Sequence, residues 1–291
     1  MLALKLWVII KIIVYRLFLV FKKGLLFFIG NYHKLIILTT SNKCNVLTSS
    51  SNYVKIIITV WRINMDEVRI IEIKKSIFDD NDKDANRLRE ELKKKGVFLL
   101  NLMSSPGSGK TTTLIRTINA LKDKIKIAVM EADIDSDVDA IKIKEATGVQ
   151  SIQLHTGGMC HLDAEMTRQG LNGLDLNDVD LAILENVGNL VCPAEFDTGA
   201  SKNCMILSVP EGHDKPLKYP LMFSICDLVL INKIDVAPYF DFDLDKCSQY
   251  IKMRNPNAEI IPICAKTGEG VNKFADWIIK NIAKWRNNDN A

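Results

Sequence analysis

The chain has 291 residues, of which 47% are hydrophobic and 25% are charged, with a formal net charge of +3. This composition is ordinary for a globular protein and leaves room for one or two domains. The seven cysteines show no paired spacing, which excludes a disulfide-stapled scaffold. With the nucleotide-binding loop described below, which indicates a reducing compartment, we expect free thiols and a cytoplasmic protein. Neither a nucleic acid nor a membrane is expected as a partner.

The charge is distributed unevenly along the chain. Residues 1–64 hold nine Lys/Arg and no Asp or Glu, whereas residues 65–291 hold 29 Lys/Arg against all 35 acidic residues. A basic, apolar extension therefore precedes an acidic body. The composition changes abruptly at Met65.

Three interpretations compete for residues 1–64. A signal anchor over residues 6–21 would contain Lys11 and Arg16, and each charge costs roughly 2.5–3.5 kcal/mol at a bilayer centre. A cleaved targeting peptide lacks a small-residue cleavage site after a clean apolar core. The third interpretation, which we favour, is that translation starts at Met65. The extension is then a mis-assigned or disordered segment, and the intact mass of the natural protein would decide.

A charged helix is expected over residues 82–95. Leu88 and Leu92 lie four residues apart on one helical face, and Gly96 is a typical residue to end a helix. Residues 65–95 therefore form a lead-in region to the main domain.

Short apolar runs then alternate with amphipathic stretches. Near-continuous apolar strands separated by helices indicate an α/β fold with a mostly parallel sheet, flanked by helices on both faces. Ligands bind beyond the carboxyl ends of such strands. The expected strands are residues 97–103, 125–130, 151–154, 181–184, 204–209, 228–231 and 259–263.

A glycine-rich loop follows the first of these strands and leads into a helical run. Strand, loop and helix are the context that a P-loop requires, although Ser104 replaces the first glycine of the usual pattern. The backbone N–H groups would cradle a polyphosphate, Lys110 would reach the outer phosphates, and the Thr111 hydroxyl would bind Mg2+. The predicted nucleotide-binding residues here are Gly107, Ser108, Gly109, Lys110, Thr111 and Thr112.

Two acidic elements follow later strands. The run Glu131-Ala132-Asp133 follows the predicted strand at 125–130 and begins an acidic loop. Asp133 would face Thr111 across the cleft and suits a Mg2+ ligand, although an acidic solvated loop is the alternative. Glu185 and Gly188 have the acid-x-x-Gly form of a γ-phosphate sensor, in which the glycine N–H reorients upon hydrolysis. With Lys110, these residues are the predicted catalytic set.

Sulfur and imidazole ligands lie close to these switch elements. Cys160 and His161 follow the strand at residues 151–154, and Cys192 lies seven residues beyond Glu185. Cysteine and histidine are ligands for Zn2+ and Ni2+, and both segments are loops that leave the same face. A buried small hydrophobe is the alternative for a lone cysteine, and we assign it to Cys204 and Cys226.

Two more loops predict guanine recognition. Asn232, Lys233 and Asp235 form an Asn-Lys-x-Asp pattern after the strand at 228–231, in which the carboxylate accepts two hydrogen bonds from guanine. A wrong base would leave that acceptor unpaired. After the last strand come Cys264, Ala265 and Lys266, where guanine-nucleotide proteins often have Ser-Ala-Lys and offer a backbone N–H to guanine O6.

Four runs of the chain resemble the signatures of the HypB family, hydrogenase nickel-incorporation GTPases of the SIMIBI class. The resemblance spans roughly residues 97–285. The runs CHLDA and ENVGNLVCP are the most specific to that family. The four signature runs are SSPGSGKTT at 104–112, HTGGMCHLDA at 155–164, ENVGNLVCPA at 185–194 and KPLKYP at 215–220.

The resemblance implies a GTPase that uses Mg2+, forms a GTP-dependent homodimer and delivers nickel to the [NiFe]-hydrogenase large-subunit precursor together with other maturation proteins. It assigns Ni2+ or Zn2+ to Cys160, His161 and Cys192, and gives Asp133 and Glu185 the Mg2+ and switch roles. Residues 96–286 would be the GTPase domain and 287–291 a tail. No cysteine-rich or histidine-rich nickel store follows Met65, and His213 is a further ligand or a surface side chain.

Three alternatives stay open from the residues. A sister metallochaperone for another nickel enzyme would carry a Cys-Pro-His motif, and Cys192-Pro193-Ala194 lacks the histidine. A P-loop small-molecule kinase would not need Asp235 or the cysteines. A metal-binding regulatory module with vestigial hydrolysis would show no turnover.

Overall fold

All strands of the sheet run parallel. In this computed structural model, the described residues form eight strands, which pair in the order β1-β4-β3-β5-β2-β6-β7-β8. The strands are β1 Arg69–Glu72, β2 Phe98–Ser104, β3 Ile127–Asp133, β4 Gln150–His155, β5 Leu181–Glu185, β6 Lys202–Ser208, β7 Leu228–Asn232 and β8 Glu259–Pro262. The predicted α/β fold with a mostly parallel sheet is thus confirmed, and the sheet is wholly parallel.

The structure describes residues 69–72, 81–133 and 138–287, all within one compact unit, Met65–Ala291. Residues 1–64, with the three interpretations offered for them, lie outside the described residues. The domain boundaries stay predictions.

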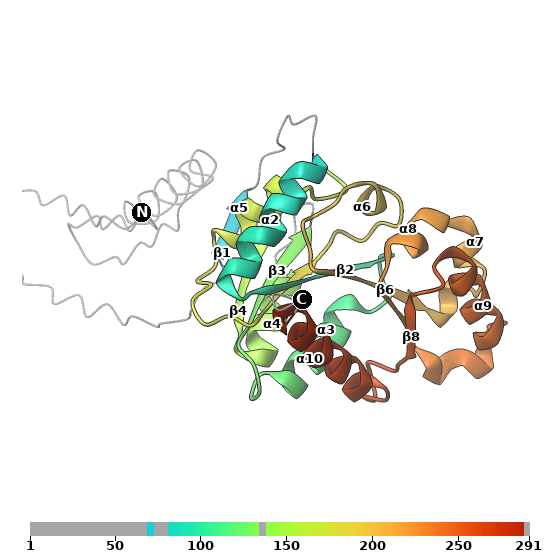
Figure 1. Cartoon of the computed structure of the whole chain (residues 1–291). Helices are drawn as coiled ribbons and strands as arrows, with labels where there is room; N and C mark the ends of the chain where they lie inside the picture. The colour runs from blue at the N-terminus through green and yellow to red at the C-terminus, as the bar shows by residue number, and fades with distance from the viewer. Residues whose placement is uncertain (1–68, 73–80, 134–137, 288–291) are drawn as a thin grey trace, which may run out of the picture. The chain divides into compact units, whose positions relative to one another are not determined.

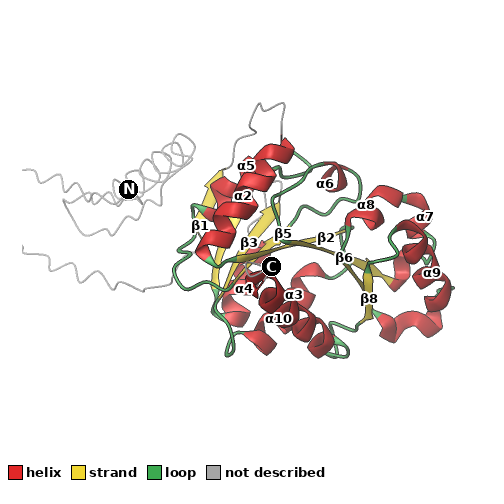
Figure 2. Cartoon of the chain, viewed as in Figure 1, coloured by secondary structure: helices red, strands yellow, loops and turns green. Residues whose placement is uncertain are grey.

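Helices cover both faces of the sheet (Figures 1 and 2). The predicted helix at 82–95 is present as α2, one residue longer at its start. The α-helices are α2 Asn81–Lys95, α3 Lys110–Leu121, α4 Val138–Thr147, α5 Ala164–Leu171, α6 Cys192–Glu195, α7 Lys215–Lys218, α8 Pro220–Ile225, α9 Leu244–Arg254 and α10 Val271–Asn287, and the 3-10 turns are η1 Val209–Glu211 and η2 Ile234–Tyr239.

The alternation of side chains along each strand divides the core into two layers. Leu100 and Leu102 of β2 pack with α3, α4 and α10 on one face, whereas Leu99 packs with α2 and α5 on the other. Farther along the second face, Val229 and Ile231 of β7 pack with α8 and α9. Both faces of the central strands are therefore buried, which explains their near-continuous apolar sequences.

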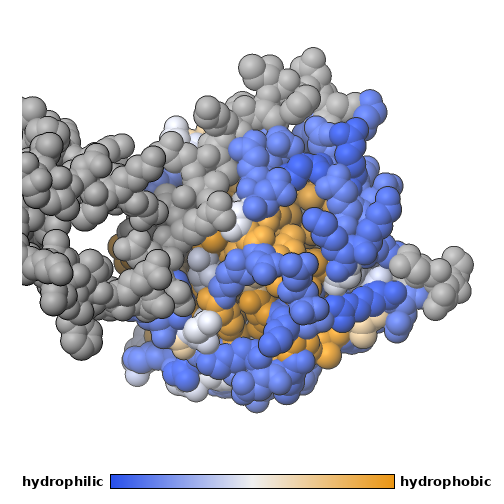
Figure 3. Space-filling view, turned by 90° about the vertical axis from the view of Figure 1, so that its left-hand side faces the viewer, coloured by the Kyte–Doolittle hydropathy of each residue, from blue (hydrophilic) through white to orange (hydrophobic). Residues whose placement is uncertain are grey.

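Strand β1 lies at one edge of the sheet. Figure 3 faces that side of the molecule and shows apolar surface framed by hydrophilic side chains. In the part of the chain that the structure describes, no helix combines the length and hydrophobicity needed to cross a bilayer. All predicted site loops leave the carboxyl ends of the strands, and so they meet at one edge of the sheet.

Candidate functional site

The P-loop connects the end of β2 to the start of α3. Gly109 precedes the helix with φ 101°, a left-handed conformation that favours glycine. The Lys110 Nζ lies back across the loop and donates to the Ser104 Oγ at 3.0 Å. The first N–H groups of α3 have no partner within the helix, so this end is suited to bind an anion. Thr112 is exposed on the first turn.

Asn232 joins three loops at this edge of the sheet. Its buried Nδ2 donates to the Ser108 carbonyl at 2.9 Å, and its Oδ1 accepts from the Ala265 N–H at 3.0 Å. A Cβ on Gly109 would lie 2.6 Å from the same Nδ2. Position 109 therefore needs glycine for space as well as for its φ angle. Asn232 ties the P-loop to the loops after β7 and β8, as the sequence predicts.

The other residues predicted to bind the guanine base surround this Asn232 junction between the P-loop and the loops after β7 and β8. The Lys233 Nζ donates to the Gly107 carbonyl at 2.7 Å, and Asp235 is exposed in the first turn of η2. The Ala265 N–H, expected to face guanine O6, is directed at Asn232 in this structure. The Cys264 Sγ is buried and accepts a hydrogen bond from the Thr267 N–H at 3.4 Å. This thiol therefore stabilises the turn of the loop after β8.

Three carboxylates gather beside the P-loop threonine. The Thr111 Oγ1 donates to the Glu185 Oε1 at 3.1 Å. Glu131, Asp139 and Glu185 each offer an oxygen, and these atoms all lie within 4.8 Å of one another. Among the described residues this is the one group of three such ligands. Asp133, the predicted Mg2+ ligand, ends β3 outside this group, and its role stays a prediction.

The electrostatics of this cluster favour a cation. Burial and the neighbouring Glu185 raise the pKa of Glu131 to about 8. Burial also raises the pKa of Glu185 to about 7, although Lys110 and the Thr111 hydrogen bond act in the opposite direction. The Oε2 atoms of both residues are buried without a hydrogen-bond partner in the described part of the chain. Oxygen ligands of this kind, beside a P-loop hydroxyl, fit Mg2+.

The predicted γ-phosphate sensor lies against the P-loop. A Cβ on Gly188 would approach Pro106 to 3.2 Å, so the two loops are in close contact. Asn186 anchors this segment, because its N–H donates to the Leu102 carbonyl at 2.9 Å and its Nδ2 donates to the Asn101 Oδ1 at 3.1 Å. The segment is therefore anchored on β2 at Asn186 and contacts the P-loop at Gly188, whose role as a sensor stays a prediction.

Glu211 is a site residue that sequence reasoning missed. Its carboxylate accepts a hydrogen bond from the P-loop Ser105 hydroxyl, and it also accepts from the Ser208 N–H and Oγ, both at 2.8 Å. The spacing Ser208-x-x-Glu211 is a capping box, which a sequence can reveal. The contact with Ser105, 106 residues away, has no local signal.

The structure brings the two loop cysteines together. The Sγ atoms of Cys160 and Cys192 lie 2.7 Å apart, and both residues are half-buried free thiols. The hydrogen bond to Cys192 and burial raise the pKa of Cys160. Cys204 and Cys226 are buried, as expected for small hydrophobes. A thiol pair of this kind supplies two ligands for a soft divalent metal.

Neither of the two histidines considered as metal ligands, His161 and His213, lies with the thiol pair in a three-ligand group of the described residues. His161 is 8% exposed and stacks on Phe196, with ring centroids 3.7 Å apart. In the described structure it does not join the two thiols as a compact three-ligand group. His213 accepts from the Asp243 N–H at 3.3 Å and packs beside Tyr250. His213 therefore connects η1 to α9 through packing and one hydrogen bond.

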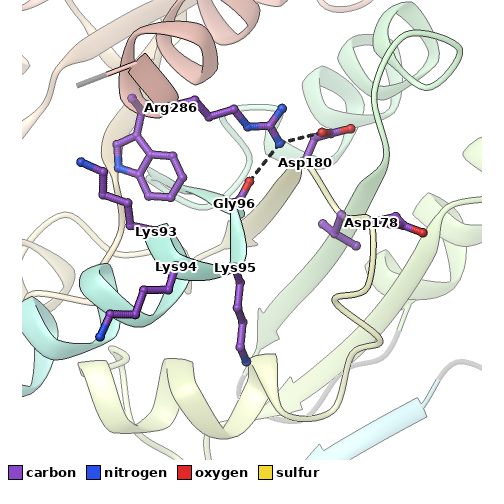
Figure 4. Close-up of a pocket in the computed structure, with 9 residues that line it drawn as sticks. Lys93, Lys94, Lys95, Gly96, Asp178, Asp180 and Arg286 are labelled. Carbon is purple, nitrogen blue, oxygen red and sulfur yellow. Dashed lines mark hydrogen bonds and ion pairs between the residues drawn. The ribbon is translucent and has the colours of Figure 1, made fainter. Parts of the chain in front are cut away.

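A shallow surface pocket of about 710 Å3 lies at the opposite end of the sheet strands (Figure 4). Lys94 and Lys95 of α2 border it, together with Arg286 at the end of α10. Arg286 donates to the Gly96 carbonyl at 2.9 Å and to Asp180 at 2.7 Å, which joins the two helix ends. This pocket shares no residue with the P-loop, the carboxylates or the thiols.

The comparisons with known proteins agree with this geometry. Residues 98–262 match the family described as "CobW/HypB/UreG, nucleotide-binding domain". The hydrogenase maturation factor HypB of Rhizobium leguminosarum bv. viciae is 43% identical over 235 residues, covering 81% of this chain and 78% of its own. The chain belongs to the HypB family. HypB of Escherichia coli (strain K12) is 45% identical and covers 74% of this chain and 73% of its own.

Solved HypB structures have the same fold. The crystal structure of HypB from Helicobacter pylori in complex with nickel is 38% identical, covers 70% of this chain and 96% of its own, and has a TM-score of 0.67. HypB from Archaeoglobus fulgidus is 36% identical, covers 70% of this chain and all of its own, and has a TM-score of 0.65. The P-loop domain described above is therefore a HypB-type nucleotide-binding domain.

Proposed function

We propose that this protein is a GTP-hydrolysing metallochaperone that binds Ni2+, with Zn2+ as a competing ion, and assists nickel insertion into a [NiFe]-hydrogenase precursor. The observation that carries the proposal is the contact between Cys160 and Cys192, because a nucleotide site alone would not need it. The names of the similar proteins support it, since they are hydrogenase maturation factors and one was crystallised with nickel.

The nucleotide would bind along the P-loop with its base at Asp235. Lys110 and the loop N–H groups would hold the phosphates, and Asp235 would select guanine. Mg2+ would be held by Thr111 and Glu185, with Asp133 as the predicted further ligand, and when bound it neutralises phosphate charge. Glu131 and Asp139 add carboxylates to the same place. The catalytic set remains Lys110, Asp133, Glu185 and Gly188.

One segment would couple hydrolysis to the metal. The chain from Glu185 to Cys192 begins at the Thr111 hydrogen bond, passes Pro106 at Gly188 and ends at the thiol pair. If the GTP and GDP states place Gly188 differently, they also place Cys192 differently relative to Cys160. Nucleotide state and metal affinity are then linked, so hydrolysis can release the ion.

Partner binding and location complete the proposal. The protein would act in the cytoplasm as a GTP-dependent homodimer and would exchange nickel with other maturation proteins. Exposed apolar side chains next to the base loop support a self-association surface, since Tyr239 is 84% exposed and Phe240 46% exposed. His161 would join the metal ligands after its stack on Phe196 opens.

Nucleotide selectivity and metal binding test the proposal together. We expect the protein begun at Met65 to hydrolyse GTP and not ATP, without transferring phosphate to a small molecule. A thiolate-to-nickel absorption band should form in the wild type and disappear in Cys192→Ala. ATP turnover with phosphoryl transfer would favour the kinase alternative. GTP binding without turnover would favour the regulatory module, and GTP turnover with no nickel band would exclude a metal carrier.

A further inference from the structure

Helix α2 contacts both chain segments that follow the paired cysteines. Cys160 and Cys192 lie 32 residues apart in sequence; Cys160 lies on the loop before α5, and Cys192 is the first residue of α6. Figure 1 shows α2 alongside α5, and both helices pack in the same core layer. The position of these loops relative to each other is therefore determined partly by a helix that precedes the P-loop domain in sequence.

The side chain of Asn81, the first residue of α2, bridges the two segments directly. Its Oδ1 accepts from the Ala164 N–H at 3.0 Å, and its Nδ2 donates to the Asp197 carbonyl at 2.9 Å. Ala164 lies four residues after Cys160, and Asp197 lies five residues after Cys192. One half-buried carboxamide thus connects the backbones of both cysteine segments.

Charged and apolar contacts along α2 hold the same two segments. Arg89 binds both carboxylate oxygens of Asp197 at 2.5 and 2.6 Å, and Glu91 pairs with Arg168 of α5. Gly199 lies so close to α2 that a Cβ there would approach the Leu88 side chain to 2.8 Å. On the Cys192 side, Arg89 and Asn81 hold the same residue, Asp197, through its side chain and its carbonyl respectively, whereas Asn81 alone of these side chains also reaches the Ala164 N–H.

We propose that Asn81 is a positioning residue for the Cys160–Cys192 pair, because its bridge sets the separation of the two sulfurs and, given the proposed metal-carrier function, their affinity for Ni2+. The residue touches neither the metal ligands nor the nucleotide loops. Loss of the bridge leaves the ion pairs of Arg89 and Glu91 in place, so α2 stays docked, while the Asp197 carbonyl and the Ala164 N–H lose the side chain that joined them and the two thiol segments gain freedom to separate.

A thiol–disulfide equilibrium measures this positioning without metal. Cys160 and Cys192 pass two electrons and two protons to glutathione disulfide, which forms one protein disulfide and two glutathione molecules. The equilibrium constant, followed by mass mapping after alkylation, reports the effective concentration of one thiol at the other. We expect Asn81→Ala to lower this constant and the Ni2+ affinity each by about tenfold, the size of losing two hydrogen bonds.

Three further variants make the test specific. Asn81→Asp keeps an acceptor for the Ala164 N–H but sets a carboxylate oxygen against the Asp197 carbonyl, so it should not restore the wild-type constant. Asn172→Ala removes the same side chain from the exposed end of α5 and should match wild type. Phe274→Leu weakens the core on the opposite face of the sheet. GTP turnover should stay unchanged in all Asn81 variants.

Two results would overturn the inference. The first is a thiol–disulfide constant of Asn81→Ala within twofold of wild type. The second is an equal loss in Phe274→Leu at matched stability, because the effect would then be global loosening. A wild type that binds no nickel, with the thiol equilibrium still shifted in Asn81→Ala, would reject the metal-carrier function and keep the positioning role.

Discussion

The nucleotide loops and the carboxylate cluster lie at the same edge of the sheet, but they satisfy their polar groups differently. At the base and P-loop junction, the Asn232 side chain uses its donor and its acceptor in hydrogen bonds, and Lys110 and Lys233 each donate to the P-loop. In the carboxylate cluster, Glu131 and Glu185 each keep a buried oxygen with no hydrogen-bond partner among the described residues.

The difference indicates that the two regions have different roles. The first is a preorganised frame, since its hydrogen bonds are made within the protein and need no ligand to form. The second concentrates negative charge in a buried place, which costs free energy unless a proton or a cation joins it. Changes in the frame should therefore affect nucleotide selection and folding, whereas changes in the cluster should affect proton and cation binding.

The largest expected effect is on base selection. Asp235→Asn replaces an acceptor with an amide that meets the guanine donors unfavourably, so GTP should bind roughly 100-fold to 1,000-fold more weakly. Xanthosine triphosphate, which has an oxygen in place of the amino group, should gain affinity. Competition with a fluorescent nucleotide measures both. The exposed Asp241→Asn serves as the control, and an unchanged GTP/XTP ratio in Asp235→Asn would contradict the assignment.

A glycine pair tests how rigid the frame is. Gly109→Ala introduces a Cβ 2.6 Å from Asn232 at φ 101°, and should lower the free energy of unfolding by roughly 1–3 kcal/mol. Gly107→Ala, at φ 73° with open space around its Cβ, carries backbone strain alone and should cost about 1 kcal/mol. Urea denaturation compares them. Equal losses of unfolding free energy in the two variants would mean that the Asn232 side chain moves away from the new Cβ at little cost.

The cluster should make the stability of the nucleotide-free protein depend on pH. The folded pKa values of Glu131 and Glu185, about 8 and about 7, lie above their ordinary value of 4.5. Between the ordinary value and the folded value, the folded state binds more protons than the unfolded state does. The free energy of unfolding should therefore fall as pH rises from about 5 to 8, by up to about 1.4 kcal/mol per pH unit for each proton.

Glu131→Gln isolates this contribution. The neutral amide resembles the protonated acid, so the variant should match wild type near pH 5 and exceed its stability near pH 8. Denaturation curves at both pH values, with Glu145→Gln on the exposed surface as control, provide the measurement. A variant that follows the same pH slope as wild type would show that Glu131 does not retain its proton.

The smallest effect is expected at the pocket remote from both regions. Arg286 is partly exposed, and its ion pair with Asp180 should contribute less than about 1 kcal/mol. Arg286→Ala should lower stability slightly and leave GTP affinity unchanged. A clear loss of nucleotide binding in this variant would mean that the frame extends across the whole sheet.

Much of the fold could be predicted because apolar runs and P-loop spacing are local signals. The seven predicted strands are all present. Strand β1 was missed because Arg69–Glu72 has four residues, of which the two at the ends are charged. A run this short gains its structure from pairing with β4, not from its own sequence.

The site was predictable where a motif is contiguous and less so where it depends on packing. The meeting of Cys160 and Cys192 was expected from loops that leave one face of the sheet. Glu131 was not assigned to the site because it lies inside a strand, where sequence alone does not show that its carboxylate meets those of Asp139 and Glu185. Asp133 was preferred for its position at the strand end; it shares a face of β3 with Glu131, two residues earlier, and the carboxylate that lies with those of Asp139 and Glu185 is that of Glu131.

The central claim is that nucleotide state controls metal affinity, and a nickel titration tests it most directly. The protein begun at Met65 would be loaded with GDP or with a non-hydrolysable GTP analogue, and the thiolate-to-nickel absorption would be followed in wild type and in Cys192→Ala. We expect different Ni2+ affinities in the two nucleotide states of the wild type and no thiolate band in the variant. Equal affinities in both states, or a band that survives Cys192→Ala, would contradict it.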